Sequence, residues 1–202
     1  MRKKFRIIIT ISIFSLLFYN FTIADEIRTR FGFYIDLPEN FVAIQDQNIG
    51  ELMNETDNDL NKEFFNDMMT GSSKQDLNIE FYYPKNLKAE YNSININVQR
   101  EVNLREIRRD ISLNEICGYY QQMFSELFKK QIRQYECKYN NNFRPKYPDV
   151  LRTKHDASQN GNFMFQYQFD YKNNLVTLTI GCEPQNCVYM EKNAINVINS
   201  IN

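Results

Sequence analysis

Apolar and polar side chains alternate one by one in two stretches of the C-terminal third, "NFMFQYQFDY" and "LVTLTIG". The apolar residues that share one face of these stretches are Phe163, Phe165, Tyr167, Phe169, Tyr171, Val176, Leu178 and Ile180. Successive side chains of a strand point to opposite faces, so a period of two predicts strands with one buried face. The intervening "KNN" is typical of a tight turn, and the sequence therefore predicts a hairpin.

The same alternation occurs earlier in the chain. A short apolar run over residues 41–44 follows an opening stretch whose apolar residues are Phe31, Phe33, Ile35 and Leu37. Two later stretches each place one set on a common face: Leu77, Ile79, Phe81 and Tyr83, then Ile94, Ile96 and Val98. We expect all these strands to join the C-terminal hairpin in an antiparallel sheet with one apolar face.

Other segments have the period of an amphipathic helix. Residues 56–71 predict a short helix. Ser112 and Glu115 have the spacing of a capping box, which satisfies two backbone N–H groups at the start of a helix. The apolar stripe behind it predicts one long helix that ends before "KYNNN": Ile116, Tyr120, Met123, Phe124, Leu127, Phe128, Ile132 and Tyr135. A closing helix is predicted from Val188, Ala194, Ile195, Ile198 and Ile201.

These elements predict the α+β class, a central antiparallel sheet with helices packed on it. The chain of 202 residues suits a single domain with a core of its own, and no internal repeat or linker divides it. We place this domain at residues 25–202. The segment "REVNLREIRRD" carries charges of both signs, which favours a solvated connection into the long helix.

Residues 1–24 have the pattern of a signal peptide. Four basic residues precede an apolar run over 7–18, which is short for a membrane span, and Ala24 offers a small residue for cleavage. The alternative is an uncleaved N-terminal anchor. Either form exports the domain, so we expect a periplasmic or secreted protein, with no membrane span once the leader is cleaved.

The charge balance bears on the partners of the exported domain. The whole chain has 24 Lys and Arg against 25 Asp and Glu. Removal of the four basic leader residues, with no acid lost, leaves 20 against 25, a net charge of -5. A mildly acidic domain lacks the long-range attraction that draws proteins to nucleic acid or anionic lipid, so we expect no nucleic-acid partner.

The four cysteines are Cys117, Cys137, Cys182 and Cys187. In an exported chain an even number of cysteines favours disulfides. Cys182 and Cys187 close a short loop, and we expect them to be bonded. Cys117 and Cys137 are candidates for a further disulfide only if the helix between them breaks, since a continuous helix would hold them about 30 Å apart. Otherwise they pair with the other two cysteines or stay free.

Patterns for catalysis or metal binding are weak. His155 is the single histidine and lies far in sequence from every cysteine, so the ligand pairs of a zinc site are missing. The cysteines do not have the C-x-x-C spacing of thiol oxidoreductases. The acidic stretch from Asp57 resembles a calcium loop, but Lys62 occupies its glycine position. We therefore expect no metal and no cofactor.

The face of the sheet opposite the apolar residues carries uncharged polar side chains. Its members are Tyr82, Asn95, Asn97, Gln166, Gln168, Thr177 and Thr179. Two interpretations stay open at this point. The face is either ordinary solvent-exposed surface or a contact surface for another protein, which requires no catalytic group.

The order of elements resembles the PsbP-like superfamily, including the DcrB-type bacterial periplasmic proteins. The resemblance lies in the opening "FGFYIDLPENF", the stretches "NGNFMFQYQF" and "LVTLTIGC", and the closing helix that ends "INVINSI". It implies an α/β/α sandwich, a second layer over part of the polar face, and a non-enzymatic accessory or assembly role. It carries no site residues over to this chain.

From the sequence we expect an exported, non-enzymatic accessory or protein-binding domain of the bacterial envelope. Its expected partner is another envelope protein. The alternative function is a periplasmic hydrolase with a site near His155, which would need a nucleophile and an orienting acid brought to the imidazole by the fold.

Overall fold

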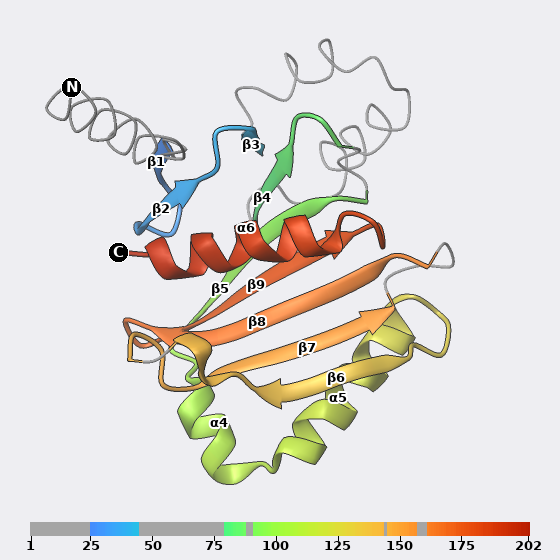
Figure 1. Ribbon diagram of the computed structural model, residues 1–202. Coiled ribbons are helices and arrows are strands. Elements are labelled where there is room, and N and C mark those ends of the chain that lie inside the picture. The colour runs from blue at the N-terminus through green and yellow to red at the C-terminus, as the bar shows by residue number, and fades with distance from the viewer. Residues whose placement is uncertain (1–24, 45–78, 88–90, 144, 157–160) are drawn as a thin grey trace, which may run out of the picture.

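The computed structural model describes residues 25–44, 79–87, 91–143, 145–156 and 161–202 (Figure 1). The predicted signal peptide and the predicted helix at 56–71 lie outside these residues and stay predictions. In the described part of the chain, no helix combines the length and the apolar character needed to cross a membrane.

A seven-stranded antiparallel sheet forms the centre of the structure, in the spatial order β3-β4-β5-β9-β8-β7-β6. The strands in chain order are β3 (Phe41–Ile44), β4 (Ile79–Pro84), β5 (Ser93–Arg100), β6 (Gln134–Tyr139), β7 (Val150–Asp156), β8 (Phe163–Tyr171) and β9 (Asn174–Cys182). The predicted hairpin is confirmed as β8–β9. Lys172 and Asn173 in its turn both have positive φ, which is the geometry of a two-residue hairpin turn.

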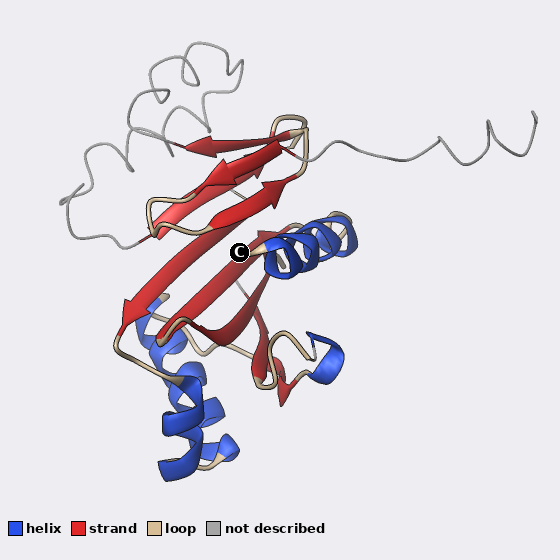
Figure 2. Ribbon diagram, turned by 90° about the vertical axis from the view of Figure 1, so that its left-hand side faces the viewer, coloured by secondary structure: helices blue, strands red, loops and turns tan. Residues whose placement is uncertain are grey.

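Helices cover both faces of this sheet, which confirms the α+β prediction and gives the layering that the family resemblance implies. Helix α6 (Cys187–Ser200) lies against one face, and helices α4 (Leu104–Asp110) and α5 (Leu113–Leu127) lie on the other (Figure 2). A single 3-10 turn, η1 (Asn141–Phe143), lies between β6 and β7.

The main core fills the space between the sheet and α6. Directly paired side chains of β5, β9 and β8 form three apolar rows: Ile94–Ile180–Phe165, Ile96–Leu178–Tyr167 and Val98–Val176–Phe169. Helix α6 covers them with Met190, Ala194, Val197 and Ile198, all fully buried. The predicted apolar face is thus confirmed for β5, β8 and β9. Val188 was placed in the helix's apolar stripe wrongly: it is 81% exposed, because it lies two positions from Met190 and so on the far side of the helix.

The opening strand takes a different place from the one predicted. Its alternation is confirmed, since Phe33, Ile35 and Leu37 are buried in the main core. However, β2 (Tyr34–Leu37) pairs with β1 (Asp25–Arg28) in a separate two-stranded ribbon, not with the main sheet. The C-terminus holds this ribbon: the backbone groups of Tyr34 and Asn202 exchange two hydrogen bonds of 3.2 and 3.1 Å.

The long helix begins as predicted but ends earlier. The capping box of Ser112 and Glu115 is present at its start. The helix stops at Leu127, because the Ser125 hydroxyl accepts a 3.0 Å hydrogen bond from the Ile132 N–H and the chain turns back. Tyr135, expected on the helix, lies in β6 instead. Apolar residues after the turn continue the helical spacing. The sequence pattern therefore does not show where the helix ends.

Candidate functional site

The polar face of the sheet is built from cross-strand pairs of β7, β8, β9 and β5. One row runs Thr153–Gln166–Thr179–Asn95, and the next runs Gln168–Thr177–Asn97. Because residues two apart on a strand share a face, both rows point toward α4 and α5, away from the main core. The structure therefore brings six of the seven predicted contact-face residues together.

Tyr82 is the exception, and its assignment to this face was wrong. It pairs with Ile94 on the main-core face, where it is 1% exposed and its hydroxyl donates a 2.6 Å hydrogen bond to Glu80. Correspondingly, Ile79 and Phe81 lie on the polar face, opposite Asn97 and Asn95. Aromatic residues occupy three successive positions of this strand, so the period of two gave no guide to which of them faces the core.

This polar face is not simple exposed surface. Gln166, Gln168 and Thr177 are buried, although they carry the amide and hydroxyl groups expected of a solvated face. Helices α4 and α5 cover them in part and leave a cavity of about 720 Å³ over the floor. The apolar side chains of its wall are Ile107, Ile111, Ile116, Tyr119, Tyr120 and Met123. The cavity thus has a polar floor and an apolar wall.

Hydrogen bonds order the side chains of the polar face. The Tyr120 hydroxyl donates to Gln168 Oε1 at 2.8 Å, and Gln166 Nε2 donates to Thr179 Oγ1 at 3.2 Å. Burial raises the pKa of Tyr120, so its hydroxyl stays a donor at neutral pH. Gln166 Oε1 and Thr153 Oγ1 are buried and have no hydrogen-bond partner among the described residues. Both atoms have almost no accessible surface, so they are enclosed by the protein and are not open to the cavity.

Charge is almost absent from the cavity. Of the described residues that line it, Glu115 alone is ionisable at neutral pH. Its carboxylate accepts hydrogen bonds from the hydroxyl and N–H of Ser112, which lower its pKa and engage it in capping α5. The floor therefore offers amides and hydroxyls, groups that bind by hydrogen bonding and do not exchange protons near neutral pH.

Helix α4 forms part of this wall, and the sequence analysis missed it. The segment was expected to be a solvated connection, but Asn103 caps a helix there and accepts a 2.9 Å hydrogen bond from the Arg105 N–H. The signal was present: a capping residue at Asn103 precedes Glu106 by three positions, and Leu104, Ile107 and Ile111 have helical spacing. The mixed charges of the exposed side obscured it.

A disulfide ties the wall to the sheet. Cys117 of α5 is bonded to Cys137 of β6, with Cα atoms 5.9 Å apart, because the early end of α5 brings the chain back beside the helix. The pairing left open by the sequence is thus resolved in favour of a broken helix. The predicted Cys182–Cys187 bond is also present and closes the loop before α6, with Cα atoms 5.0 Å apart.

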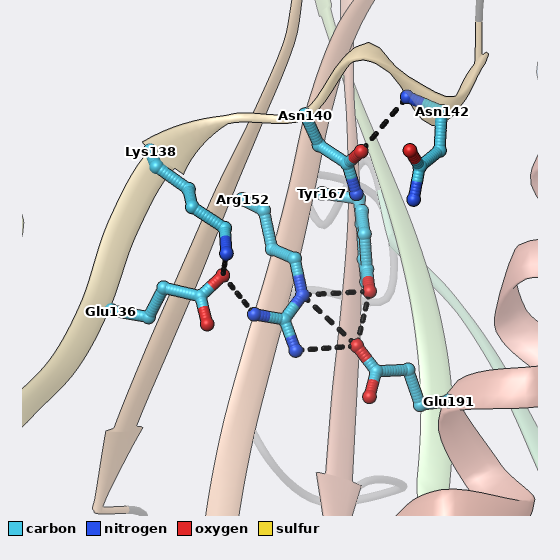
Figure 3. A network of polar contacts seen from close by, with 7 residues as sticks. All are labelled: Glu136, Lys138, Asn140, Asn142, Arg152, Tyr167 and Glu191. Carbon is cyan, nitrogen blue, oxygen red and sulfur yellow. Dashed lines mark hydrogen bonds and ion pairs between the residues drawn. The ribbon is translucent and has the colours of Figure 1, made fainter.

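A second polar cluster lies near the opposite face, where Arg152 joins three elements (Figure 3). Its guanidinium bonds Glu191 of α6, at 2.6 Å from Nη2, and also Glu136 of β6. Tyr167 donates to the same Glu191 and accepts from Arg152 Nε at 2.9 Å. Lys138 lies 3.1 Å from Glu136, so two cations match two carboxylates. This balance suits a structural tie between α6 and the sheet.

His155, the centre of the alternative hydrolase hypothesis, is fully buried on β7. Its ring lies 4.9 Å from that of Phe124, and neither of its nitrogens has a hydrogen-bond partner among the described residues. Burial lowers its pKa to about 4, so the imidazole is neutral at physiological pH. No nucleophile or acid is hydrogen-bonded to the imidazole within the described part of the chain, although the charge of Asp156 acts on it, and the hypothesis gains no support. No cluster of metal-ligating side chains occurs in that part either.

Comparisons with known proteins rest on structure alone. No protein-family model matches the chain, and no curated protein does. The solution structure of cyanobacterial PsbP (CyanoP) from Synechocystis sp. PCC 6803 matches with a TM-score of 0.57, over 92% of this chain and 95% of that one. The fold is PsbP-like. Sequence identity between the two chains is only 6%, so the likeness shows the fold and nothing more.

A second solved structure matches this chain over part of its length. It is a crystal structure from Bacteroides thetaiotaomicron VPI-5482, with 8% identity and a TM-score of 0.44 over 84% of this chain and 44% of that one. At this TM-score the alignment carries no argument about fold or role.

Proposed function

We propose that this protein is an exported, non-enzymatic accessory domain that binds another protein of the bacterial envelope at the mouth of the α4–α5 cavity. The observation that carries the proposal is the exposure of large apolar side chains there. Tyr119 is 65% exposed and Ile111 is 43% exposed, and both line the cavity. Exposed apolar groups beside polar ones are typical of protein-contact surfaces, in which aromatic residues supply most of the binding energy.

Export is supported by the leader pattern and by the cysteines. Residues 1–24 have the composition of a signal peptide, and all four cysteines lie in disulfides. Disulfides persist in oxidising compartments and are rare in the cytosol of mesophiles. An accessory role agrees with the PsbP-like fold and with a cavity floor of amides and hydroxyls.

The test is site-specific photocrosslinking in intact cells of the native host. Tyr119→p-benzoylphenylalanine places the crosslinker at the cavity mouth, and Val188→p-benzoylphenylalanine is the matched control on α6, where the side chain is 81% exposed. We expect a reproducible, light-dependent adduct with one envelope protein from position 119 and none from position 188.

Two results would contradict the proposal. One is the absence of any reproducible adduct at position 119 when the variant is exported and folded, with both disulfides confirmed by non-reducing peptide mapping. The other is the same set of adducts from both positions, which would show random collision and not a docking surface.

A further inference from the structure

We propose that the cavity between α4–α5 and the sheet binds an uncharged, amphipathic small molecule. The inference deepens the proposed function, because it assigns a ligand to the cavity whose mouth is proposed to contact the partner protein. Two independent properties of the cavity support it: the division into polar and apolar surfaces, and the near absence of charge.

The two surfaces define the body of the ligand. Amides and hydroxyls of β5, β8 and β9 make most of the floor, to which Ile79 and Leu175 add apolar side chains, and aliphatic and aromatic side chains of α4 and α5 make the wall. A volume of about 720 Å³ lies inside the range typical of small-molecule pockets, which combine a mainly apolar lining with a few placed polar groups. A flat or elongated molecule with one polar edge fits this division.

The charge of the lining sets the charge of the ligand. No lysine, arginine or histidine occurs among the described residues that line the cavity, and Glu115 contributes one negative charge there. A phosphate, sulfonate or carboxylate would be desolvated without a counter-ion, which is costly. The Glu115 carboxylate already bonds Ser112, so it does not call for a cation. A neutral ligand is the class that remains.

The probe for this site is N-phenyl-1-naphthylamine, an uncharged aromatic amine with a single N–H donor whose fluorescence rises in apolar surroundings. We expect saturable binding of one probe molecule per folded chain. The anionic probe 1-anilinonaphthalene-8-sulfonate is expected to bind more weakly than the neutral amine.

One variant connects binding to the cavity. Asn97→Phe fills space above the floor and should weaken binding of the amine about tenfold or more by steric overlap. Val188→Phe on the exposed side of α6 is the matched control and should leave binding unchanged. Circular dichroism and disulfide mapping establish that each variant is folded.

Absence of saturable amine binding by the folded wild-type protein would overturn the inference, as would binding that Asn97→Phe leaves unchanged. Equal or tighter binding of the sulfonate would overturn the assignment of a neutral ligand. The proposed function fails on a different result. A reproducible adduct at position 119 without probe binding supports the protein contact and rejects the small molecule, and the opposite pair of results does the reverse.

Discussion

At the scale of single residues, His155 shows how far burial decides a side chain's role. An imidazole can act as a base when it has partners and a pKa near neutrality. Here the ring lies against Phe124 with both nitrogens unbonded among the described residues, and burial lowers its pKa to about 4. Such a histidine contributes to the pH dependence of stability.

The sign of that dependence follows from the lowered pKa. In the unfolded chain the imidazole of His155 has a pKa of about 6.5. Below that pH the unfolded chain binds a proton there and the folded chain does not. The contribution of His155 to the free energy of unfolding is therefore fully present above that pH and is lost as the pH falls toward 4. We expect this to cost about 2 kcal/mol at pH 5 relative to pH 7.

The measurement is urea unfolding at both pH values, with the disulfides intact. In His155→Leu the leucine fits the apolar surroundings and cannot titrate, so the loss of stability between pH 7 and pH 5 should shrink by that amount. Other acidic groups titrate equally in both proteins. An unchanged pH dependence in the variant would show that His155 is not the group responsible.

Sequence reasoning succeeded where apolar and polar residues alternate regularly along a strand. Ile94, Ile96 and Val98 alternate with asparagines, and the period of two gave their buried face correctly. It failed at Tyr82, whose neighbours Phe81 and Tyr83 are equally apolar. It also took the polar floor for possible open surface, because alternation shows which face is polar and not what covers it. Whether the polar face is covered depends on where α4 and α5 pack, and that is set by the tertiary structure.

At the scale of elements, the end of α5 is the feature that the sequence pattern did not reveal. The apolar residues Phe128, Ile132 and Tyr135 continue the helical period on paper, so no local signal marked the break at Leu127. Pairing of β6 with β7 and the bond from Cys117 to Cys137 favour the turn over a longer helix. Both interactions join residues that only the finished fold brings together.

The two disulfides should therefore differ in their contribution to stability. The Cys117–Cys137 bond spans 20 residues and the Cys182–Cys187 bond spans 5. A longer closed loop restricts the unfolded chain more, by about 3 kcal/mol for the first bond and about 2 kcal/mol for the second. We expect Cys117→Ala/Cys137→Ala to lower the free energy of unfolding more than Cys182→Ala/Cys187→Ala does.

Denaturant unfolding of both double variants at one pH measures this difference. Because the first bond also anchors the wall of the cavity, its removal should weaken binding of the neutral amine as well, whereas removal of the second bond should not. A larger loss of stability from the shorter loop, with binding unaffected by either change, would contradict the place given to the Cys117–Cys137 bond.

At the scale of the whole molecule, the two faces of one sheet have opposite characters. The α6 face is apolar and closely packed, with three apolar rows beneath fully buried helix residues. The α4–α5 face has a mainly polar floor, two small apolar clusters and a cavity that residues of both clusters line. Stability is thus concentrated on one side of the sheet, which leaves the other side available for binding.

The C-terminus closes the packed side. Ile201 is 1% exposed in the main core, and Asn202 pairs with Tyr34 through the backbone, so these two residues hold the β1–β2 ribbon against the body. We expect Ile201→Ala to lower the free energy of unfolding by about 3 kcal/mol, the cost typical of a cavity left by a large aliphatic side chain. Val188→Ala, at an 81% exposed position, should change it by less than about 0.5 kcal/mol.

Limited trypsin digestion separates this effect from general loss of stability. Arg28 and Arg30 are exposed on the ribbon, and cleavage there needs the ribbon to leave the body. In Ile201→Ala these sites should be cut faster than sites in the main sheet, because the C-terminal pairing with Tyr34 loses its anchor before the sheet opens. An equal increase in cleavage rate at all sites would mean that Ile201 stabilises the fold as a whole and does not specifically hold the ribbon in place.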